Sequence, residues 1–411
     1  MKNKKALVIG LVWPEPTSSA AGWRMLQLID LFLEFKYEVT FVSAAQRTDR
    51  SFDMNSIGVL SKKIELNNAS FDTFLLDLSP DLVLFDRFIT EEQYGWRVTE
   101  QVPQAIKILD AEDFHGLRKA RELAFKMQEE LSIKLLHNEV TKREIVAMYR
   151  CDLTLVISEV EVNILSSVFK FPRSMMLYMP FFYDQADLPG LDTSVEFSQR
   201  QHFITVGNYR HAPNADALDY LKQEIWPEIR RSLPEAELHV YGAYQSAKAQ
   251  QLHKDVEGFI IRGSVPDITE VMTAYKVCLA PLRFGAGLKG KVFDAMCSGT
   301  PLIMTNIAAE GVFGELEPAG FIANDPQEFI IKAVSLYKQR NLWIRKHDLG
   351  YQVLANRFKK SEHASNFNTF LCKIEASLLA HRQNNFIGQL FHQQSLLASK
   401  YLSKWIEAKN R

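Results

Sequence analysis

The stretch PLRFGAGLKGKVFDAMCSGTP, residues 281–301, combines the residue types that bind phosphate groups. Arg283 and Lys289 are cations on either side of a glycine-rich turn. Gly285 and Gly287 permit backbone angles that other residues resist, so their N–H groups can form an anion-binding concavity. A lysine in the first turn of a helix opposes the helix dipole, and a bound diphosphate would supply compensating charge. The spacing therefore predicts a diphosphate-binding loop, with a glycine-rich turn and solvated lysines as the structural alternative.

Asp294 lies five residues after Lys289, about one and a half turns along the expected helix. Its side chain can therefore face the same cleft as the lysine. A carboxylate suits the vicinal hydroxyl groups of a ribose, because both of its oxygens accept hydrogen bonds. Together with the loop residue Leu288, Asp294 completes a predicted binding site for a nucleoside diphosphate.

A second set of side chains able to do chemistry follows the apolar run AIKILD. Its members are Asp110, Glu112, Asp113 and His115. A carboxylate or an imidazole at the end of a strand can orient a hydroxyl group or accept its proton, and we expect His115 and Asp113 to do so. The alternative is a helix N-terminus that Asp113 caps and whose dipole Glu112 complements. Asp86 and Arg87, which follow the preceding apolar run, are candidates for binding an acceptor.

Two further loops follow apolar runs that predict strands. The small residues of PEPTSSAAGWR let a backbone approach a ligand at the start of a helix, and Gly22 and Arg24 are candidate binding residues there. This segment lacks the G-x-G-x-x-G of nicotinamide enzymes and the G-x-x-x-x-G-K-[ST] of P-loop enzymes. The second loop carries Gly207, Asn208, Arg210 and Asn214 at another helix N-terminus. Its alternative is a simple cap formed by Asn214 or Asp216.

Short apolar runs alternate with helical segments along most of the chain. Runs rich in Val, Ile and Leu predict parallel strands that helices cover on both faces. The polar segment 181–201 interrupts this pattern, and we interpret it as an interdomain linker. We therefore expect an α/β protein with two Rossmann-like, doubly wound domains, residues 1–185 and 200–372, that face each other across a cleft. Ligands of such sheets lie beyond the carboxyl ends of the strands, where the candidate residues are found.

The C-terminal segment 376–411 is predicted to be helical and amphipathic. Its apolar residues near helical spacing are Phe386, Leu390, Leu397, Tyr401 and Trp405. We expect this tail to pack back on the first domain or to form a homodimer. Contact with a membrane surface is the less favoured alternative, because few lysines flank the segment.

Composition excludes several classes of function. The 411 residues carry 48 basic and 49 acidic side chains, so no overall field favours nucleic acid or an anionic membrane, and any anion site must be local. Four cysteines lie far apart without a C-x-x-C pair, which predicts buried thiols in a reducing compartment rather than a disulfide framework or a zinc site. The apolar run 6–13 is too short for a signal peptide and predicts a first strand. We expect a cytoplasmic protein.

The sequence resembles the retaining glycosyltransferases of the GT-B superfamily, of the family 4 type. The resemblance is carried by LRFGAGLKGKVFDAMCSGTPLIMTNIAAEGV (282–312) and TVGNYRHAPNADALDYLKQEIWPEIRRSLPEAELHVYG (205–242). The segment 262–282 also matches the usual order of residues in this family. Segment 155–161 and the loop before the first helix resemble the family more loosely.

The resemblance implies a nucleotide-diphosphate-sugar donor bound mainly by the second domain. Asp294 would hold the ribose, Arg283 and Lys289 the diphosphate, and Arg262 to Val265 the base. His115 or Asp113 would contribute to the donor sugar and acceptor. Such enzymes need no metal or other cofactor for transfer, because protein cations and helix N-termini stabilise the leaving diphosphate.

Three positions differ from the family pattern. Position 286, eight residues before Asp294, is an alanine where the family often has a glutamate. Asp294 itself replaces the usual glutamate, and MPFFYD (179–184) replaces the usual Pro-Asn-Gly.

The resemblance implies a retaining, metal-independent transferase that acts on a glycan, lipid-linked or protein-linked acceptor in surface polysaccharide or glycoconjugate biosynthesis. It also implies work in the cytoplasm, with the inner face of the membrane as a possible site of action. A sugar-nucleotide epimerase of the same fold and a catalytically weak binding or scaffold protein are the alternatives.

Overall fold

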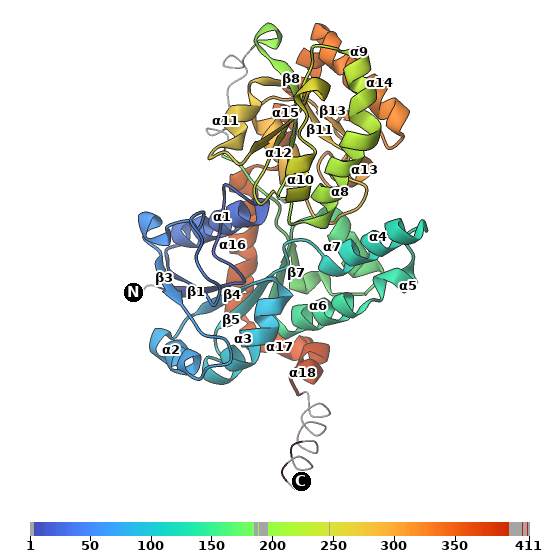
Figure 1. The fold of residues 1–411 in the computed structure, drawn as a ribbon. Helices are drawn as coiled ribbons and strands as arrows, with labels where there is room; N and C mark the ends of the chain where they lie inside the picture. Colours follow the sequence, from blue (N-terminus) through green and yellow to red (C-terminus); the bar gives the residue numbers. More distant parts are fainter. Residues whose placement is uncertain are drawn as a thin grey trace.

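The computed structural model describes residues 4–184, 188, 196–245, 247–393, 405 and 409. The chain forms two α/β domains, drawn one above the other in Figure 1, and each is built on one parallel sheet. This architecture confirms the predicted pair of doubly wound domains, and the C-terminal helices follow the second domain.

The first domain contains a parallel sheet in the order β3-β2-β1-β4-β5-β6-β7. Its strands are β1 (Lys4–Gly10), β2 (Tyr37–Ser43), β3 (Leu60–Lys63), β4 (Leu82–Asp86), β5 (Ile106–Asp110), β6 (Leu153–Val156) and β7 (Met176–Tyr178). All residues of β4, β5 and β6 are buried, as the apolar runs predict for central parallel strands. Asp86 pairs with Asp110 in the sheet, so the ends of β4 and β5 lie side by side.

Helices cover both faces of this sheet. They are α1 (Ala20–Glu34), α2 (Ser70–Leu78), α3 (Arg87–Gln101), α4 (His115–Met127), α5 (Ile133–Leu136), α6 (Glu139–Arg150) and α7 (Glu159–Ser167). One face buries apolar side chains of α2, α3, α4, α6 and α7, and the other buries those of α1.

The second domain contains a parallel sheet in the order β10-β9-β8-β11-β12-β13. Its strands are β8 (Gln201–Val206), β9 (Leu238–Tyr241), β10 (Phe259–Gly263), β11 (Tyr275–Ala280), β12 (Leu302–Met304) and β13 (Gly320–Ile322). Its helices are α8 (Ala212–Tyr220), α9 (Trp226–Ser232), α10 (Ala247–Gln251), α11 (Ile268–Met272), α12 (Gly290–Cys297), α13 (Asn306–Ala309), α14 (Pro326–Lys338) and α15 (Arg340–Arg357).

The chain returns to the first domain after α15. The N–H of Lys360 donates to the carbonyl of Tyr183, and the N–H of Tyr183 donates to Phe358. Helix α16 (Lys360–Ala376) then buries Phe367, Leu371 and Ile374 in the core cluster that also holds β1 and α1. These three residues share one helical face, which explains the docking. The domain boundary that we placed at residue 372 therefore falls inside a helix of the first domain's core.

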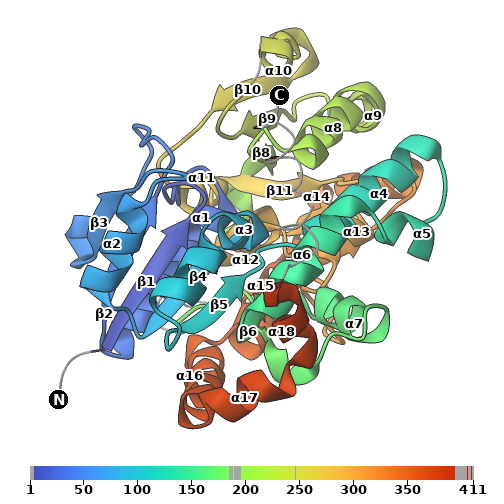
Figure 2. The ribbon, with the colours of Figure 1, turned by 90° about the horizontal axis from the view of Figure 1, so that it is seen from below.

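Two more helices, α17 (Leu378–Asn384) and α18 (Phe386–Gln393), follow along the first domain (Figure 2). Arg382 forms an ion pair with Asp152 at 2.7 Å, and Phe391 packs against Tyr149. Phe386 and Leu390 are exposed. Leu397 and Tyr401 of the expected amphipathic tail lie outside the described residues. Among the helices that the structure describes, none combines the length and apolar character needed to span a membrane.

Candidate functional site

A cleft of about 800 Å³ separates the two domains. Its walls include loops that follow strands β1, β5, β6 and β7 of the first domain and β8 to β11 of the second. The cleft thus lies at the carboxyl ends of both sheets, where ligands of doubly wound domains bind.

Two helix N-termini meet in this cleft. Helix α1 begins after Ser19, whose Oγ accepts a hydrogen bond from the N–H of Gly22 at 3.1 Å. Helix α12 begins at Gly290, where an added Cβ would lie 2.6 Å from the Cβ of Ala20. Because each N-terminus carries a positive partial charge and unpaired N–H groups, their convergence favours an anion.

Lys289 and Lys291 bring positive charge to the same point. Lys289 is the residue before α12, is 8% exposed, and its Nζ donates to the carbonyl of Gly287 at 2.6 Å. Lys291 Nζ donates to Oδ1 of Asn214 at 3.0 Å. Burial lowers the pKa of each ammonium to about 8. Two desolvated cations beside two helix N-termini form a strong site for a multiply charged anion.

Lys291 was not among the residues that we selected from the sequence. The signal was present as the second lysine of the triplet Lys289-Gly290-Lys291. Because Lys289 and Lys291 are two positions apart, helical spacing alone would direct them to different sides of α12. The structure shows that both line the cleft, Lys291 through its hydrogen bond to Asn214.

The first domain holds the glycine-rich loop from the opposite side. The N–H of Gly287 donates to Oε1 of Glu161 at 2.7 Å, and Arg121 donates to the carbonyl of Gly285 at 2.8 Å. Gly287 has φ +66°, and an added Cβ would lie 2.7 Å from the Cβ of Asp113. The glycine therefore permits close contact between the domains, and its N–H serves that contact rather than an open concavity.

Arg283 does not enter the cleft, contrary to our prediction. Its guanidinium forms a two-point ion pair with Asp216, at 2.9 Å through Nε and 2.7 Å through Nη2. It also lies 4.7 Å from the ring centre of Phe125 and 4.5 Å from that of Tyr220. Because Asp216 neutralises it and two aromatic rings flank it, Arg283 is fixed beside the cleft as a structural cation.

Asp294 lines the cleft as predicted for a ribose ligand. Its side chain is partly buried, and this burial raises the pKa of its carboxyl to about 7, with Asp267 raising it further and Lys291 lowering it. Asp267 caps helix α11 through hydrogen bonds from the N–H groups of Thr269 and Glu270. Val265 lines the cleft beside this loop. Arg262 lies outside the cleft and contacts His239, with 3.4 Å between the nitrogens.

The loop after β8 contributes polar groups to the cleft. Gly207, Asn208 and Asn214 line it, and Leu288 lies opposite. Asn214 donates to the carbonyl of Asn208 at 3.0 Å, which fixes the loop in front of α8. Arg210 turns away and stacks on Tyr244, with its guanidinium carbon 3.6 Å from the ring centre.

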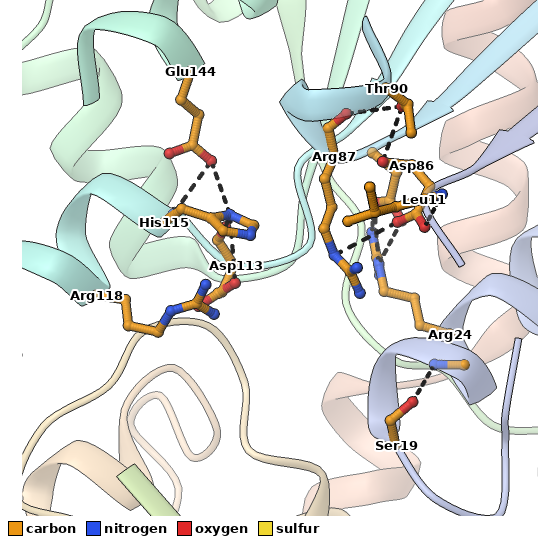
Figure 3. A network of polar contacts seen from close by, with 12 residues as sticks. Leu11, Ser19, Arg24, Asp86, Arg87, Thr90, Asp113, His115, Arg118 and Glu144 are labelled. Carbon is orange, nitrogen blue, oxygen red and sulfur yellow. Dashed lines mark hydrogen bonds and ion pairs between the residues drawn. The ribbon is translucent and has the colours of Figure 1, made fainter. Parts of the chain in front are cut away.

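The first domain presents Asp113 to the cleft and keeps His115 behind it (Figure 3). Asp113 pairs with Arg118, which lowers the pKa of the carboxyl against the opposing effect of burial. Burial alone would lower the pKa of His115, but Asp113 and Glu144 raise it. His115 Nδ1 lies 2.8 Å from the carbonyl oxygen of Asp113 and 3.4 Å from Oε1 of Glu144. His115 thus orients the loop from the side facing away from the cleft.

The four predicted acceptor-binding residues lie outside the cleft-lining set. Arg24 is completely buried, pairs with Asp110 at 2.8 Å and donates to the carbonyl of Met179, so it joins strand ends. Asp86 accepts from the N–H of Leu11, and Arg87 lies 3.7 Å from Asp86 (Figure 3). An added Cβ on Gly22 would lie 2.6 Å from the backbone of Glu15, so this glycine permits tight packing of the loop.

An aromatic wall stands where the family usually has Pro-Asn-Gly. Tyr183 and Phe181, from the stretch MPFFYD, pack against Trp23 at 5.2 and 5.4 Å between ring centres. Phe293 stacks on Tyr183, with 6.3 Å between the centres and 10° between the planes. All four side chains line the cleft beside α1 and α12.

The comparisons with known proteins agree with this geometry. Residues 200–339 match the family model described as glycosyl transferases group 1. The second domain is a group 1 glycosyltransferase domain. The family predicted from the sequence is thereby confirmed for this domain.

Solved structures of similar fold cover nearly the whole chain. Sucrose-phosphate synthase from Thermosynechococcus elongatus superposes with a TM-score of 0.68 at 12% identity, over 91% of this chain and 100% of that one. A pneumococcal O-GlcNAc transferase, solved with UDP and GlcNAc, gives a TM-score of 0.67 at 13% identity, over 91% and 99%. These likenesses establish the GT-B fold.

A curated relative from Klebsiella pneumoniae, an uncharacterized 44.6 kDa protein in the cps region, is 24% identical over 181 residues. The match spans 42% of this chain and 44% of the relative. Among the described residues, no group of three or more His, Cys, Asp or Glu side chains is arranged to hold a metal ion.

Proposed function

We propose that this protein is a retaining, metal-independent glycosyltransferase that moves a sugar from a nucleotide-diphosphate-sugar to a glycan or glycoconjugate acceptor. The observation that carries the proposal is the meeting of the α1 and α12 N-termini with Lys289 and Lys291 in the interdomain cleft. Such a site matches a diphosphate in charge, and both lysines lie in the domain that matches the group 1 glycosyltransferases.

Each part of the donor has a matching group in the cleft. The diphosphate would lie at the two helix N-termini, and Asp294 would accept hydrogen bonds from the ribose hydroxyls. Val265 and its loop would face the base. The sugar would then lie beside the contact between the glycine-rich loop and Asp113 of the first domain, because both line the cleft together with Lys289.

The lysines and helix N-termini would stabilise the charge that develops on the departing diphosphate. The bond between the sugar's anomeric carbon and the phosphate oxygen breaks, and the acceptor oxygen forms its bond to that carbon on the same face. The acceptor's proton passes to the departing phosphate. Because protein cations stabilise the leaving group, this mechanism requires no metal ion.

The printed names of similar proteins support the substrate class. The pneumococcal transferase was solved with UDP and GlcNAc, and another similar structure is a lipopolysaccharide outer core galactosyltransferase with a TM-score of 0.58. The curated relative belongs to a cps region. We propose a role in surface polysaccharide or glycoconjugate biosynthesis in the cytoplasm, with a glycan, a lipid-linked or a protein-linked acceptor. A peripheral membrane contact or a dimer through the tail remains a prediction.

A donor screen tests this function. The protein is incubated with UDP-, GDP- and dTDP-sugars, binding is ranked by thermal shift, and hydrolysis or transfer is followed by release of the nucleoside diphosphate. We expect one nucleotide class to raise the melting temperature and its sugar conjugate to be hydrolysed slowly without an acceptor. Epimerised donor would identify an epimerase instead, and an absence of binding across the panel would contradict the proposal.

A further inference from the structure

Glu112 is a buried carboxyl group that lines the cleft without an apparent structural task. It follows β5 directly before Asp113, and its residue is only 7% exposed. Its Oε1 has no hydrogen-bond partner among the described residues. Burying an unpaired polar atom is unfavourable, so such atoms in folded proteins call for an explanation, and a bound ligand is one.

The backbone at this position is strained as well. Glu112 has φ +57°, in the left-handed region that residues other than glycine rarely adopt. Arg87, at the end of the neighbouring strand β4, has φ +68°. Strain of this kind is concentrated at functional sites, where it aims a side chain that a relaxed backbone would direct elsewhere.

The surrounding charges suit a group that exchanges hydrogen bonds with a neutral ligand. Burial raises the pKa of the Glu112 carboxyl to about 8, with Asp110 and Asp86 raising it and Arg87 and Arg24 lowering it. At neutral pH the carboxyl therefore carries a proton. In this form it both donates and accepts a hydrogen bond, as a sugar hydroxyl group does.

The segment of the opposite wall that packs against the loop after β5 carries no polar side chain of its own. The loop residues are Gly285, Ala286 and Gly287, and Gly287 packs against Asp113, the neighbour of Glu112. A sugar attached to the diphosphate would therefore find side-chain hydrogen-bonding partners at this point in the first domain.

We propose that Glu112 is a specificity-determining residue whose carboxyl binds a hydroxyl group of the sugar carried by the nucleotide donor. This inference rests on the proposed function. It assigns the side chain to the sugar and not to the nucleotide. A failure of this inference would therefore appear only in the binding measured for the Glu112 variants, whereas a failure of the proposed function would also remove nucleotide binding by the wild-type protein.

Glu112→Gly and Glu112→Gln test the assignment. A donor pair, such as UDP with UDP-glucose or GDP with GDP-mannose, is chosen from the class that the wild-type protein binds, and both affinities are measured by calorimetry. We expect Glu112→Gly to weaken the sugar nucleotide about tenfold, one hydrogen bond's effect, while the nucleoside diphosphate binds as before. Glu112→Gln keeps a donor and an acceptor, and we expect it to stay within about threefold of wild type.

Stability gives an independent readout. Glycine relieves the strained backbone and removes a buried unpaired carboxyl, so the melting temperature of Glu112→Gly is expected to equal or exceed that of wild type. A residue kept only for structure would instead lower it. Glu91→Gln is the matched control for the binding measurements, because Glu91 is also a buried glutamate of this domain but pairs with Arg150 outside the cleft. We expect it to leave the affinity for the sugar nucleotide unchanged.

Sugar-nucleotide affinity unchanged in Glu112→Gly would overturn the inference, and so would an equal loss for nucleotide and sugar nucleotide. If Glu112→Gly does not fold, Glu112→Leu replaces it. A loss of affinity of about tenfold or more for the sugar nucleotide alone would then support the inference, and an unchanged affinity would overturn it. Failure of the wild-type protein to bind any member of the donor panel would instead contradict the proposed function.

Discussion

The N–H of Gly287 donates a hydrogen bond to Oε1 of Glu161 across the domain boundary, over 2.7 Å. The same oxygen accepts from the N–H of Phe114 at 2.9 Å, so one carboxyl joins the loop after β5 to the glycine-rich loop of the other domain. Burial raises the pKa of Glu161 to about 8, although both backbone bonds oppose this rise. Glu161 therefore positions the loop that leads into Lys289.

Removing this link is expected to loosen the loop. Glu161→Ala leaves the N–H of Gly287 without its partner, so we expect about tenfold weaker donor binding and a more open arrangement in small-angle scattering. Glu161→Gln keeps the accepting oxygen and should stay within about threefold of wild type. Equal affinities in all three proteins would show that the loop keeps its place without Glu161.

Lys289 and Lys291 are expected to act on the leaving diphosphate. Lys289→Ala and Lys291→Ala should each lower kcat/KM about 100-fold, the usual effect of removing a group that stabilises developing charge. The control is Lys222→Ala, since Lys222 pairs with Glu257 away from the cleft. Steady-state kinetics with each folded variant measures the loss, and unchanged kinetics in both would remove the phosphate assignment.

Lys289→Met should separate stability from activity. Burial makes the charged form of Lys289 unfavourable in the folded protein, as its lowered pKa shows. An apolar side chain of similar length removes this penalty, so we expect the free energy of unfolding to rise by about 1–2 kcal/mol while donor binding falls. Chemical denaturation at pH 7 measures the first effect. A marked loss of stability would mean that hydrogen bonds and nearby carboxylates stabilise the Lys289 ammonium by more than its burial costs.

Arg283 allows a test between the phosphate-binding role predicted from the sequence and the structural role indicated by its ion pair with Asp216. Because Asp216 and two aromatic rings hold its guanidinium, we expect Arg283→Gln to lower the melting temperature and to leave the affinity for the nucleoside diphosphate within about threefold. Calorimetry and thermal unfolding of the same sample check both statements. A hundredfold loss of affinity at unchanged stability would restore the phosphate role predicted from the sequence.

Activity should depend on pH in two steps. The carboxyl of Asp294, with a pKa of about 7, is neutral below that value and ionises above it, so ribose binding improves as the pH rises through 7. Lys289 and Lys291 lose their charge above about 8, where Glu112 and Glu161 also ionise, so diphosphate binding then weakens. We expect kcat/KM to be greatest between pH 7 and 8. Asp294→Asn should abolish the rise at low pH and leave the fall at high pH.

Removal of divalent metal ions is expected to leave activity unchanged. The proposed mechanism relies on Lys289, Lys291 and two helix N-termini, so treatment with excess EDTA should not alter the rate of donor turnover. The check is a turnover assay before and after EDTA, with added Mg²⁺ or Mn²⁺ as the comparison. Activity that disappears with EDTA and returns with metal would require a different stabilisation of the leaving group.

The fold class and the main loop could be predicted from the sequence alone. Continuous apolar runs such as LVLFD predict buried parallel strands whatever their neighbours, because only a sheet covered on both faces buries every side chain. The glycines and lysines between residues 285 and 291 likewise predict an anion site, since their chemistry is local to one loop. Asp294 follows from helical spacing on the same short helix.

Only the tertiary structure decided which polar side chains reach the ligand. Arg283 and Arg24 are cations beside strand ends like Lys289, but carboxylates from distant parts of the chain, Asp216 and Asp110, neutralise them. Glu112 and Glu161 are ordinary acidic residues in the sequence. Their unpaired oxygens, and in Glu112 the left-handed backbone, exist only once the two domains and neighbouring strands are placed together. Residue type fixes what a side chain can bind, whereas burial and long-range charge pairing fix whether it is free to do so.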